Sequence, residues 1–378
     1  MRSFKVKTND SHKSLLGCIG EHTNNVGVKI KNLYERIDAT GKFENLIANL
    51  VSDTSFSSPT SDAGIIEIKI TNLDSLVPGT VLNVSELNVA NVLYDPSSMD
   101  NALFCTNNCD NLCIMCSQPP LDREDYQFFH DLNLKIVDLI DSNCLVLGLT
   151  GGEPLLHPTL FACLLSRIRD RLPTTQINIL TNGRAFSDSH SCKSIAEVAS
   201  ENFVWEIPVH SDSYVIHDHI AGKNGAFLET FTGLLKFSES SPRISIRHII
   251  QKSNATRVND FARFVSKNLP FVESISFMGL EYVGYAKKNL NEIHLDLKVH
   301  QTELEAAVFL LSSSGINVSI FNLPLCMLKE SLWDYAYKSI DSHKRHYLPI
   351  CDKCSVINEC GGIFRSNETV YSDSIHPL

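Results

Sequence analysis

Eight of the twelve cysteines fall into two groups, one in the middle of the chain and one near its end. The first group lies in CTNNCDNLCIMC and comprises Cys105, Cys109, Cys113 and Cys116. The second comprises Cys326, Cys351, Cys354 and Cys360. Thiolates are ligands for zinc and for iron–sulfur clusters, so metal chemistry is expected at both places.

The spacing of the first group is C-x3-C-x2-C over Cys109, Cys113 and Cys116. Three thiolates on a short loop suit three irons of a 4Fe-4S cube and leave the fourth iron open to another ligand. Structural zinc normally takes four ligands, and Cys105 would supply the fourth. Spacing alone therefore leaves both metals open.

A second motif follows one predicted strand later, where LVLGLTGGEP ends in Gly151, Gly152 and Glu153. Glycines lack side chains and allow a ligand to approach the backbone closely. The Glu153 carboxylate would accept hydrogen bonds from an ammonium group. A plain strand-to-helix turn explains GGEP in isolation, but its position after the cysteine loop favours a binding site.

The elements that must position these residues alternate between strand and helix from about residue 102. Apolar runs predict strands in NALFCT, CLVLGLTGG, QINILTNG, FVWEIPVH, RISIRHII and VESISFMGL, with helical spacing between most of them. About six such units favour a parallel sheet or barrel, with functional residues at the carboxyl ends of the strands. We therefore expect an α/β fold, a partial (β/α)6 TIM-like barrel.

Together, the cysteine loop, TGGEP and this alternation resemble the radical S-adenosylmethionine (SAM) superfamily over residues 102 to about 285. The resemblance implies that Cys109, Cys113 and Cys116 hold a 4Fe-4S cluster whose fourth iron is chelated by SAM. One electron would cleave SAM, and a 5′-deoxyadenosyl radical would abstract a substrate hydrogen. The family often has an aromatic residue where this chain has Met115. Cys105 is expected to be buried and unbound.

The resemblance also implies where SAM would bind, and it assigns no catalytic side chain beyond the cluster and SAM. Gly151, Gly152 and Glu153 would receive the methionine amino end. Four further positions near SAM follow from strand ends: Asn182, Ser211, Arg247 and Met278. Arg247 would reach the SAM carboxylate, and Met278 would lie near the adenine. Ordinary strand-end polarity is the alternative for these four residues.

The second cysteine group has the spacing C-x24-C-x2-C-x5-C. Four thiolates would close a structural zinc site. Beside the preceding motifs, the segment instead resembles the truncated SPASM, or twitch, extension. That resemblance implies a second 4Fe-4S cluster held by Cys326, Cys351, Cys354 and Cys360. The choice between iron–sulfur and zinc stays open here.

A narrower resemblance comes from CIMCSQPP, TGGEP, FMGLE and NLPLC, together with CDKC and CGG. These segments are similar to the C-type radical SAM maturase of the His-Xaa-Ser peptide-modification system. This implies a ribosomally made peptide substrate, a second radical SAM maturase as partner, and an electron donor such as flavodoxin or ferredoxin. A radical SAM enzyme acting on a small molecule and a non-catalytic zinc scaffold are the alternatives.

Composition limits the remaining possibilities. The 378 residues are 43% hydrophobic and 20% charged, and the net charge of −10 disfavours nucleic-acid or anionic-membrane partners. No signal peptide or membrane-spanning run is evident, so a cytoplasmic location is expected. A reducing cytosol disfavours disulfides. Buried thiols are therefore expected at the isolated cysteines, which are Cys18, Cys144, Cys163 and Cys192.

Three domains are expected along the chain. Residues 1–99 form a small, partly β domain, in which GIIEIKI and PGTVLNV read as two strands around a Pro-Gly turn. Residues 100–300 form the radical SAM core, and residues 301–378 form the C-terminal iron–sulfur extension. The role of the N-terminal domain is not indicated by its residues.

Overall fold

The computed structural model describes residues 3–8, 15–23, 27–35, 45–52, 65–70, 77–84 and 89–378. Side chains are described for residues 77–83 and 91–378. The chain divides into two compact units. One contains residues 1–104, 128–148 and 164–177, and the other contains residues 105–127, 149–163 and 178–378.

A closed barrel is formed by the first strands of the chain, in the order β1-β5-β4-β3-β2-β6-β7. These strands are β1 Ser3–Thr8, β2 Leu15–Thr23, β3 Gly27–Glu35, β4 Asn45–Ser52, β5 Ile65–Ile70, β6 Val81–Val84 and β7 Val89–Tyr94. GIIEIKI and PGTVLNV are both strands, as expected, but they do not pair with each other. β5 pairs with β1 and β4, whereas β6 pairs with β2 and β7.

The later strands form a second, seven-stranded sheet in the order β14-β13-β12-β11-β10-β9-β8. They are β8 Ala102–Phe104, β9 Val146–Thr150, β10 Gln176–Leu180, β11 Phe203–Pro208, β12 Arg243–Ile249, β13 Ser274–Met278 and β14 Asn317–Phe321. Pairing from β11 to β14 is parallel. The expected α/β class with a parallel sheet is confirmed, and β14 adds a strand from beyond residue 300.

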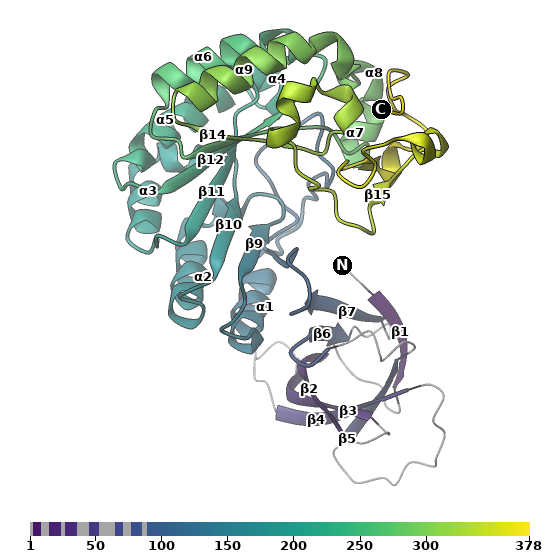
Figure 1. Ribbon diagram of the computed structural model, residues 1–378. Coiled ribbons are helices and arrows are strands. Elements are labelled where there is room, and N and C mark those ends of the chain that lie inside the picture. The colour runs from purple at the N-terminus through teal and green to yellow at the C-terminus, as the bar shows by residue number, and fades with distance from the viewer. Residues whose placement is uncertain are drawn as a thin grey trace. The chain divides into compact units, whose positions relative to one another are not determined.

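Helices connect these strands (Figure 1). They are α1 Tyr126–Leu139, α2 Pro158–Arg171, α3 Ser189–Ala196, α4 Tyr214–Ala221, α5 Ala226–Ser238, α6 Val258–Asn268, α7 Gly284–Lys288, α8 Leu290–Ile293 and α9 Gln301–Ser313. Among them, α6 and α9 pack against each other. Among the helices that the structure describes, none combines the length and apolar composition needed to cross a membrane.

The register of the parallel strands brings their carboxyl ends to one edge. Ile249, Met278 and Phe321 are opposite one another across β12, β13 and β14, and Pro208 is opposite Arg247. The loops that follow these strands therefore leave the sheet at the same edge. In parallel α/β folds this edge is where ligands bind, so the chain's functional residues are expected there.

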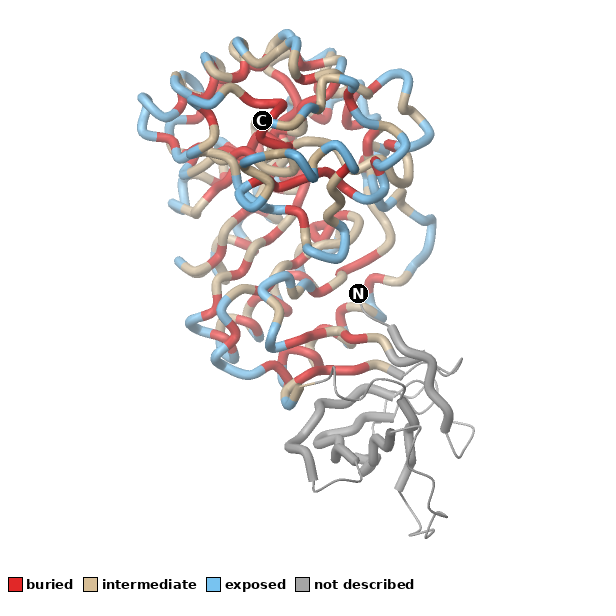
Figure 2. Tube along the Cα trace, turned by 45° about the vertical axis from the view of Figure 1, so that its right-hand side comes forward, coloured by how far each residue is buried: buried red, intermediate tan, exposed pale blue. Residues whose placement is uncertain are grey.

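Aromatic side chains make up part of the core of the second unit, and Figure 2 shows the buried residues of the chain in red. Trp205 on β11 lies edge-on to Phe186 and Phe237, whose rings stack 4.1 Å apart. All three side chains are fully buried. Leu234 is buried on the same helix as Phe237, α5, while Leu228 is exposed. The helix therefore has one apolar face that stabilises it against the sheet.

One cysteine expectation is wrong. Cys144 and Cys192 are buried as expected, but Cys163 is exposed. Its helix, α2, buries Phe161, Leu164, Leu165 and Ile168, which recur at helical spacing. Cys163 falls between these positions and so faces away from the buried stripe. The side chain of Cys18 lies outside the described residues.

Replacing Leu234 by Ala should lower the free energy of unfolding by about 2–5 kcal/mol, because it removes buried methyl groups and leaves a cavity. Leu228→Ala on the same helix is the matched control, and it should change the value by less than about 0.5 kcal/mol. Urea denaturation followed by circular dichroism measures both. Equal effects of the two substitutions would contradict the buried face assigned to α5.

Candidate metal and S-adenosylmethionine site

The cysteine loop, residues 105–117, is docked by its backbone on the turn that ends β9. Cys105 N donates to Thr150 O at 2.8 Å, and Gly152 N donates to Thr106 O at 2.7 Å. Glu153 N donates to Asn108 O at 2.8 Å. The two segments quoted in the sequence as separate motifs are therefore paired in space. All the residues of this site belong to the second unit.

Glycine is required in this turn because the cysteine loop occupies the space of a side chain. A Cβ built on Gly152 would lie 1.8 Å from Asn108 O. Gly151 has a φ of +135°, and its Cβ would lie 2.7 Å from Thr106 O. The space that these glycines leave at their Cβ positions is thus filled by the loop backbone, whereas the sequence suggested an approaching ligand.

Two more glycines hold the other end of the loop. A Cβ on Gly222 would lie 2.2 Å from Leu112 O, and one on Gly284 would lie 2.6 Å from Cys116 O. Leu112 N and Ile114 N donate to the last carbonyls of α4, at 3.0 Å each, and Tyr285 N donates to Cys116 O at 2.8 Å. Backbone hydrogen bonds thereby fix the loop from both sides.

Within the C-x3-C-x2-C motif, the Cys113 thiol lies within electrostatic reach of both Cys109 and Cys116. Burial, with a smaller contribution from the neighbouring Cys116 thiol, raises the pKa of Cys113 to about 12. Burial also raises the pKa of Cys109, with a smaller contribution from Cys113. Cys105 is 3% exposed, as expected for a buried thiol. The soft donor set of three neighbouring thiols fits an iron–sulfur cluster.

Glu153 is buried and hydrogen-bonded on both carboxylate oxygens. Oε1 accepts from Leu155 N at 2.8 Å and Thr181 Oγ1 at 2.5 Å, and Oε2 accepts from Asn182 N at 2.7 Å. Burial raises the pKa of Glu153 to about 7 despite these donors. A carboxylate offers about four acceptor positions, so one remains for a further donor. The side chain therefore ties two turns together and still has capacity for an ammonium group.

Three further sequence-derived positions lie at or near strand ends, and two of them, Ser211 and Arg247, have polar partners within the protein. Ser211 is buried, and its hydroxyl donates to Asp212 at 3.3 Å and accepts from Ser213 N at 3.1 Å. Arg247 forms an ion pair with Glu206 on the adjacent strand. Met278 ends β13 and is 8% exposed. Arg247 is therefore already neutralised by a neighbouring carboxylate.

Sequence inspection missed a polar group that contacts the interior of the cysteine loop. The side chain of Arg184 is 8% exposed and contacts Asp110 and Asn111 at 2.8 Å each. Asn182 donates to the Asp110 carboxylate at 2.7 Å through its side-chain amide. The sequence did contain a sign of this role, because Arg184 follows Asn182 by two residues in LTNGR.

The four C-terminal cysteines line a single cavity. They are Cys326, Cys351, Cys354 and Cys360. Burial raises the pKa of Cys326, and Cys360, Cys351 and Cys354 add to that rise. The Cys360 sulfur accepts from Leu325 N and Gly362 N at 3.4 Å each. Backbone N–H groups directed at a sulfur are the contacts that tune iron–sulfur centres.

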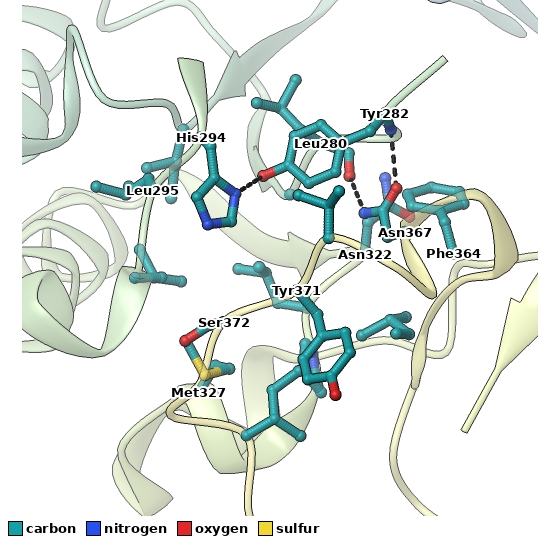
Figure 3. Close-up of a pocket in the computed structure, with 18 residues that line it drawn as sticks. Leu280, Tyr282, His294, Leu295, Asn322, Met327, Phe364, Asn367, Tyr371 and Ser372 are labelled. Atoms are coloured by element: carbon teal, nitrogen blue, oxygen red, sulfur yellow. Dashed lines mark hydrogen bonds between the residues drawn. The ribbon is translucent and has the colours of Figure 1, made fainter. Parts of the chain in front are cut away.

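A second, larger cavity adjoins the C-terminal segment, and Figure 3 shows Tyr282 and His294 among its lining side chains. The two cavities share Pro324, Ile363 and Ile375 as wall residues. The lining of the larger cavity is mostly apolar. Tyr282 and His294 provide a polar edge, with the tyrosine hydroxyl 2.8 Å from His294 Nδ1. A concave apolar lining with a few polar groups is typical of sites that bind part of a small molecule or a side chain.

Within residues 77–83 and 91–378, no three His, Cys, Asp or Glu side chains converge at a point where one metal ion would fit. That geometry concerns a single ion. In a 4Fe-4S cube the thiolates bond to different irons, so they are spread over the corners of the cluster.

No protein-family model matches the chain. A curated relative is the tungsten-containing aldehyde ferredoxin oxidoreductase cofactor-modifying protein of Pyrococcus furiosus. The two are 23% identical over 227 residues, which are 58% of this chain and 61% of the relative. The chain thus spans about six-tenths of that protein.

Several solved structures resemble the chain, among them the following three. SuiB of Streptococcus suis bound to S-adenosylmethionine has a TM-score of 0.47 and 14% identity, over 62% of this chain and 51% of SuiB. A histidine-tagged anSMEcpe with bound AdoMet has a TM-score of 0.49 and 14% identity, over 73% of this chain and 88% of anSMEcpe. HemN of Escherichia coli is a coproporphyrinogen III oxidase and a radical SAM enzyme. It has a TM-score of 0.43 and 12% identity, over 57% of this chain and 52% of HemN. Such distant likenesses do not transfer an activity by themselves.

Replacing Gly152 by Ala should destabilise the protein by about 3 kcal/mol or more, because the new methyl group would overlap the Asn108 carbonyl. Gly361→Ala is the control: there a Cβ would meet its nearest neighbour at 3.4 Å, an ordinary contact. Its expected loss is below about 1 kcal/mol. Denaturant titration compares the two, and a Gly152→Ala protein as stable as Gly361→Ala would show that the loop does not dock on this turn.

Proposed function

We propose that the protein is a radical SAM enzyme that modifies a ribosomally synthesised peptide of the His-Xaa-Ser type. The observation that carries the proposal is the docking of the C-x3-C-x2-C loop on the TGGE turn at one edge of a parallel sheet. The loop that carries the three thiols then lies against the segment of Glu153, whose carboxylate has room for one more donor. This pairing suits a cluster with one open iron and the amino end of SAM.

In this proposal Cys109, Cys113 and Cys116 hold the first 4Fe-4S cluster. Gly151, Gly152 and Glu153 receive the amino end of SAM, and Asn182, Ser211, Arg247 and Met278 lie near its remaining parts. When bound, the cluster and SAM would supply a 5′-deoxyadenosyl radical that removes a hydrogen atom from the substrate. The work of the protein is to place these groups and to exclude water from them.

A second 4Fe-4S cluster held by Cys326, Cys351, Cys354 and Cys360 belongs to the same proposal. Their common cavity and the two N–H donors to Cys360 support it. Zinc is the alternative for these thiolates, because sites made of four cysteines suit either metal.

The substrate is proposed to place a side chain in the cavity edged by Tyr282 and His294. This cavity shares wall residues with that of the C-terminal cysteines, so a bound group would lie beside the proposed second cluster. The motif context of CIMCSQPP, FMGLE and NLPLC supports a peptide as the substrate. A second radical SAM maturase and a flavodoxin or ferredoxin are proposed partners.

A small-molecule substrate is the second candidate. The Pyrococcus relative is a cofactor-modifying protein, and it favours this candidate. The same cavity would then hold part of that molecule. The two candidates share the cluster chemistry and differ only in what occupies the cavity.

Anaerobic reconstitution of the full chain should give about eight irons and eight sulfides per protein, because each of two cubes holds four of each. Reduction in the presence of SAM should yield 5′-deoxyadenosine, measured by liquid chromatography. Cys113→Ala should abolish that product. Cys360→Ala should lose about four irons and keep the first cluster. Cys163→Ala, at an exposed thiol, is the control and should match the wild type.

Zinc without sulfide, and no SAM cleavage, would contradict the enzyme proposal and favour a zinc scaffold. About four irons with retained SAM cleavage, together with zinc, would keep the enzyme and assign zinc to the C-terminal cysteines. Activity in Cys113→Ala would contradict the assignment of that ligand.

Co-expression with a His-Xaa-Ser peptide and the partner maturase should change the mass of the peptide, measured by mass spectrometry. Val370→Trp would fill the cavity from its half-exposed wall, so it should abolish the mass change while both clusters still assemble. Leu228→Trp, at an exposed position of α5, should leave the modification intact. An unmodified peptide beside a wild-type enzyme that cleaves SAM would favour the small-molecule candidate.

A further inference from the structure

A short turn of the second unit, residues 296–298, contacts two separate segments of the wall around the four C-terminal cysteines. The Lys298 ammonium donates to Cys326 O at 2.8 Å. The Asp296 carboxylate accepts from Ser374 Oγ at 2.6 Å. Cys326 lines the cysteine cavity, and so do residues 375, 376 and 378, which follow Ser374. One turn therefore reaches two parts of the cavity wall that are far apart in the sequence.

Both contacts start from the same capped turn. Asp296 Oδ1 accepts from Lys298 N at 3.0 Å and caps the 3-10 helix Leu297–His300, while Oδ2 holds Ser374. The side chain of Leu297 is buried, and the 3-10 helix continues into α9, which packs against α6. The turn is thus fixed to the α/β core by contacts that do not involve the cysteines.

Residues 372–378 are held at a second point, next to the cysteines themselves. Ser355, which follows Cys354, donates to Leu378 O through its backbone N at 2.8 Å and through Oγ at 2.9 Å. Between the two points, Ile375 lines both the cysteine cavity and the larger cavity edged by Tyr282. The segment therefore connects the turn of residues 296–298 to the loop that carries Cys354.

The four thiols need such support because no long element carries them. Cys326 lies on the 3-10 helix Leu325–Met327, and Cys351 lies on another, Pro349–Lys353. Bringing two short segments together across a long stretch of chain costs conformational entropy. A lysine ammonium on a backbone carbonyl is a charge-assisted hydrogen bond, which is stronger than a neutral one. The Lys298 contact is thus suited to fix the Cys326 segment before a metal binds.

From these contacts we infer that Asp296 and Lys298 act as a clamp that positions the C-terminal thiols for metal binding. Lys298 acts on Cys326, and Asp296 acts through Ser374 on residues 372–378. The inference rests on the proposed function, since it presumes a metal at these cysteines, and it applies equally to an iron–sulfur cluster and to zinc. Ligands that the protein has already placed release a metal more slowly, because little ordering is left for the metal to impose.

The test follows metal loss at each cysteine group in the reconstituted full-length protein. The protein is mixed anaerobically with a chelator and iodoacetamide, and peptide mass spectrometry follows the alkylation of each cysteine, since a thiol reacts once its metal is gone. Lys298→Met should speed the alkylation of Cys351 and Cys354 by about tenfold to a hundredfold, the usual effect of losing a residue that orients a metal ligand. Lys298 does not contact these two thiols, so they report release of the metal. Cys113 should keep its wild-type rate.

A second variant and two conservative ones separate positioning from general loosening. Ser374→Ala removes the hydroxyl that Asp296 holds, so it should speed the same two thiols by about tenfold. Lys298→Arg and Ser374→Thr keep a donor at each place and should restore the wild-type rate. Lys252→Met is the matched control, because that ammonium reaches another backbone carbonyl, Asn291 O at 3.5 Å, and is not among the residues that line the cysteine cavity. It should leave every rate unchanged.

Wild-type rates at Cys351 and Cys354 in both Lys298→Met and Ser374→Ala, with full metal content, would overturn the clamp and leave the proposed function intact. An equal acceleration at Cys113 would also overturn it, because the clamp acts on one cysteine group. If Lys298→Met fails to fold, Ser374→Ala decides the test alone. A wild-type protein in which reconstitution gives Cys351 and Cys354 no protection would instead overturn the proposed C-terminal metal site, and this inference with it.

Discussion

The contact on which the candidate site depends is the backbone pairing between the cysteine loop and the turn after β9. Gly152 allows the Asn108 carbonyl to approach to a distance that any side chain would block. Because of this approach, three backbone hydrogen bonds form, and the loop becomes an extension of the sheet edge. The positions of the thiols then follow from the sheet, and sites built on regular elements are more precise than sites on loops alone.

The two cysteine groups are held by different means. The first depends on the sheet edge, on four glycines and on a buried arginine, so its geometry follows from elements distributed over the whole unit. In the second group, Cys326 and Cys351 lie on short 3-10 helices, and all four cysteines surround one cavity, where backbone N–H groups of nearby residues meet the Cys360 sulfur. A loop fixed by long-range packing can leave one coordination position open. Four thiols around one cavity suit a site whose positions are all filled by the chain.

The sequence predicted those features that depend on residues close together in the chain. Spacing identified the cysteine motifs, and apolar runs identified the strands from β8 to β13, because both follow from neighbouring residues. The close approach of Asn108 to Gly152 was not predicted, since the two residues are distant in the sequence. Arg184 was missed for the same reason, because its partners Asp110 and Asn111 also lie far before it in the chain. Cys163 was misplaced because burial of a lone cysteine was assumed without its helical phase.

Most polar groups around the first cysteine group form hydrogen bonds within the protein, and only a few positions remain to bind a ligand. Glu153 uses three acceptor positions to join two turns, and only the remaining one is free for a ligand. Asn182 likewise supports Asp110 and Glu153 before it can contact anything else. A site built in this way changes little when a ligand arrives, because its side chains are already held by the protein. Its specificity must then come from the few acceptors and donors left free, and from the shape of the cavity beside them.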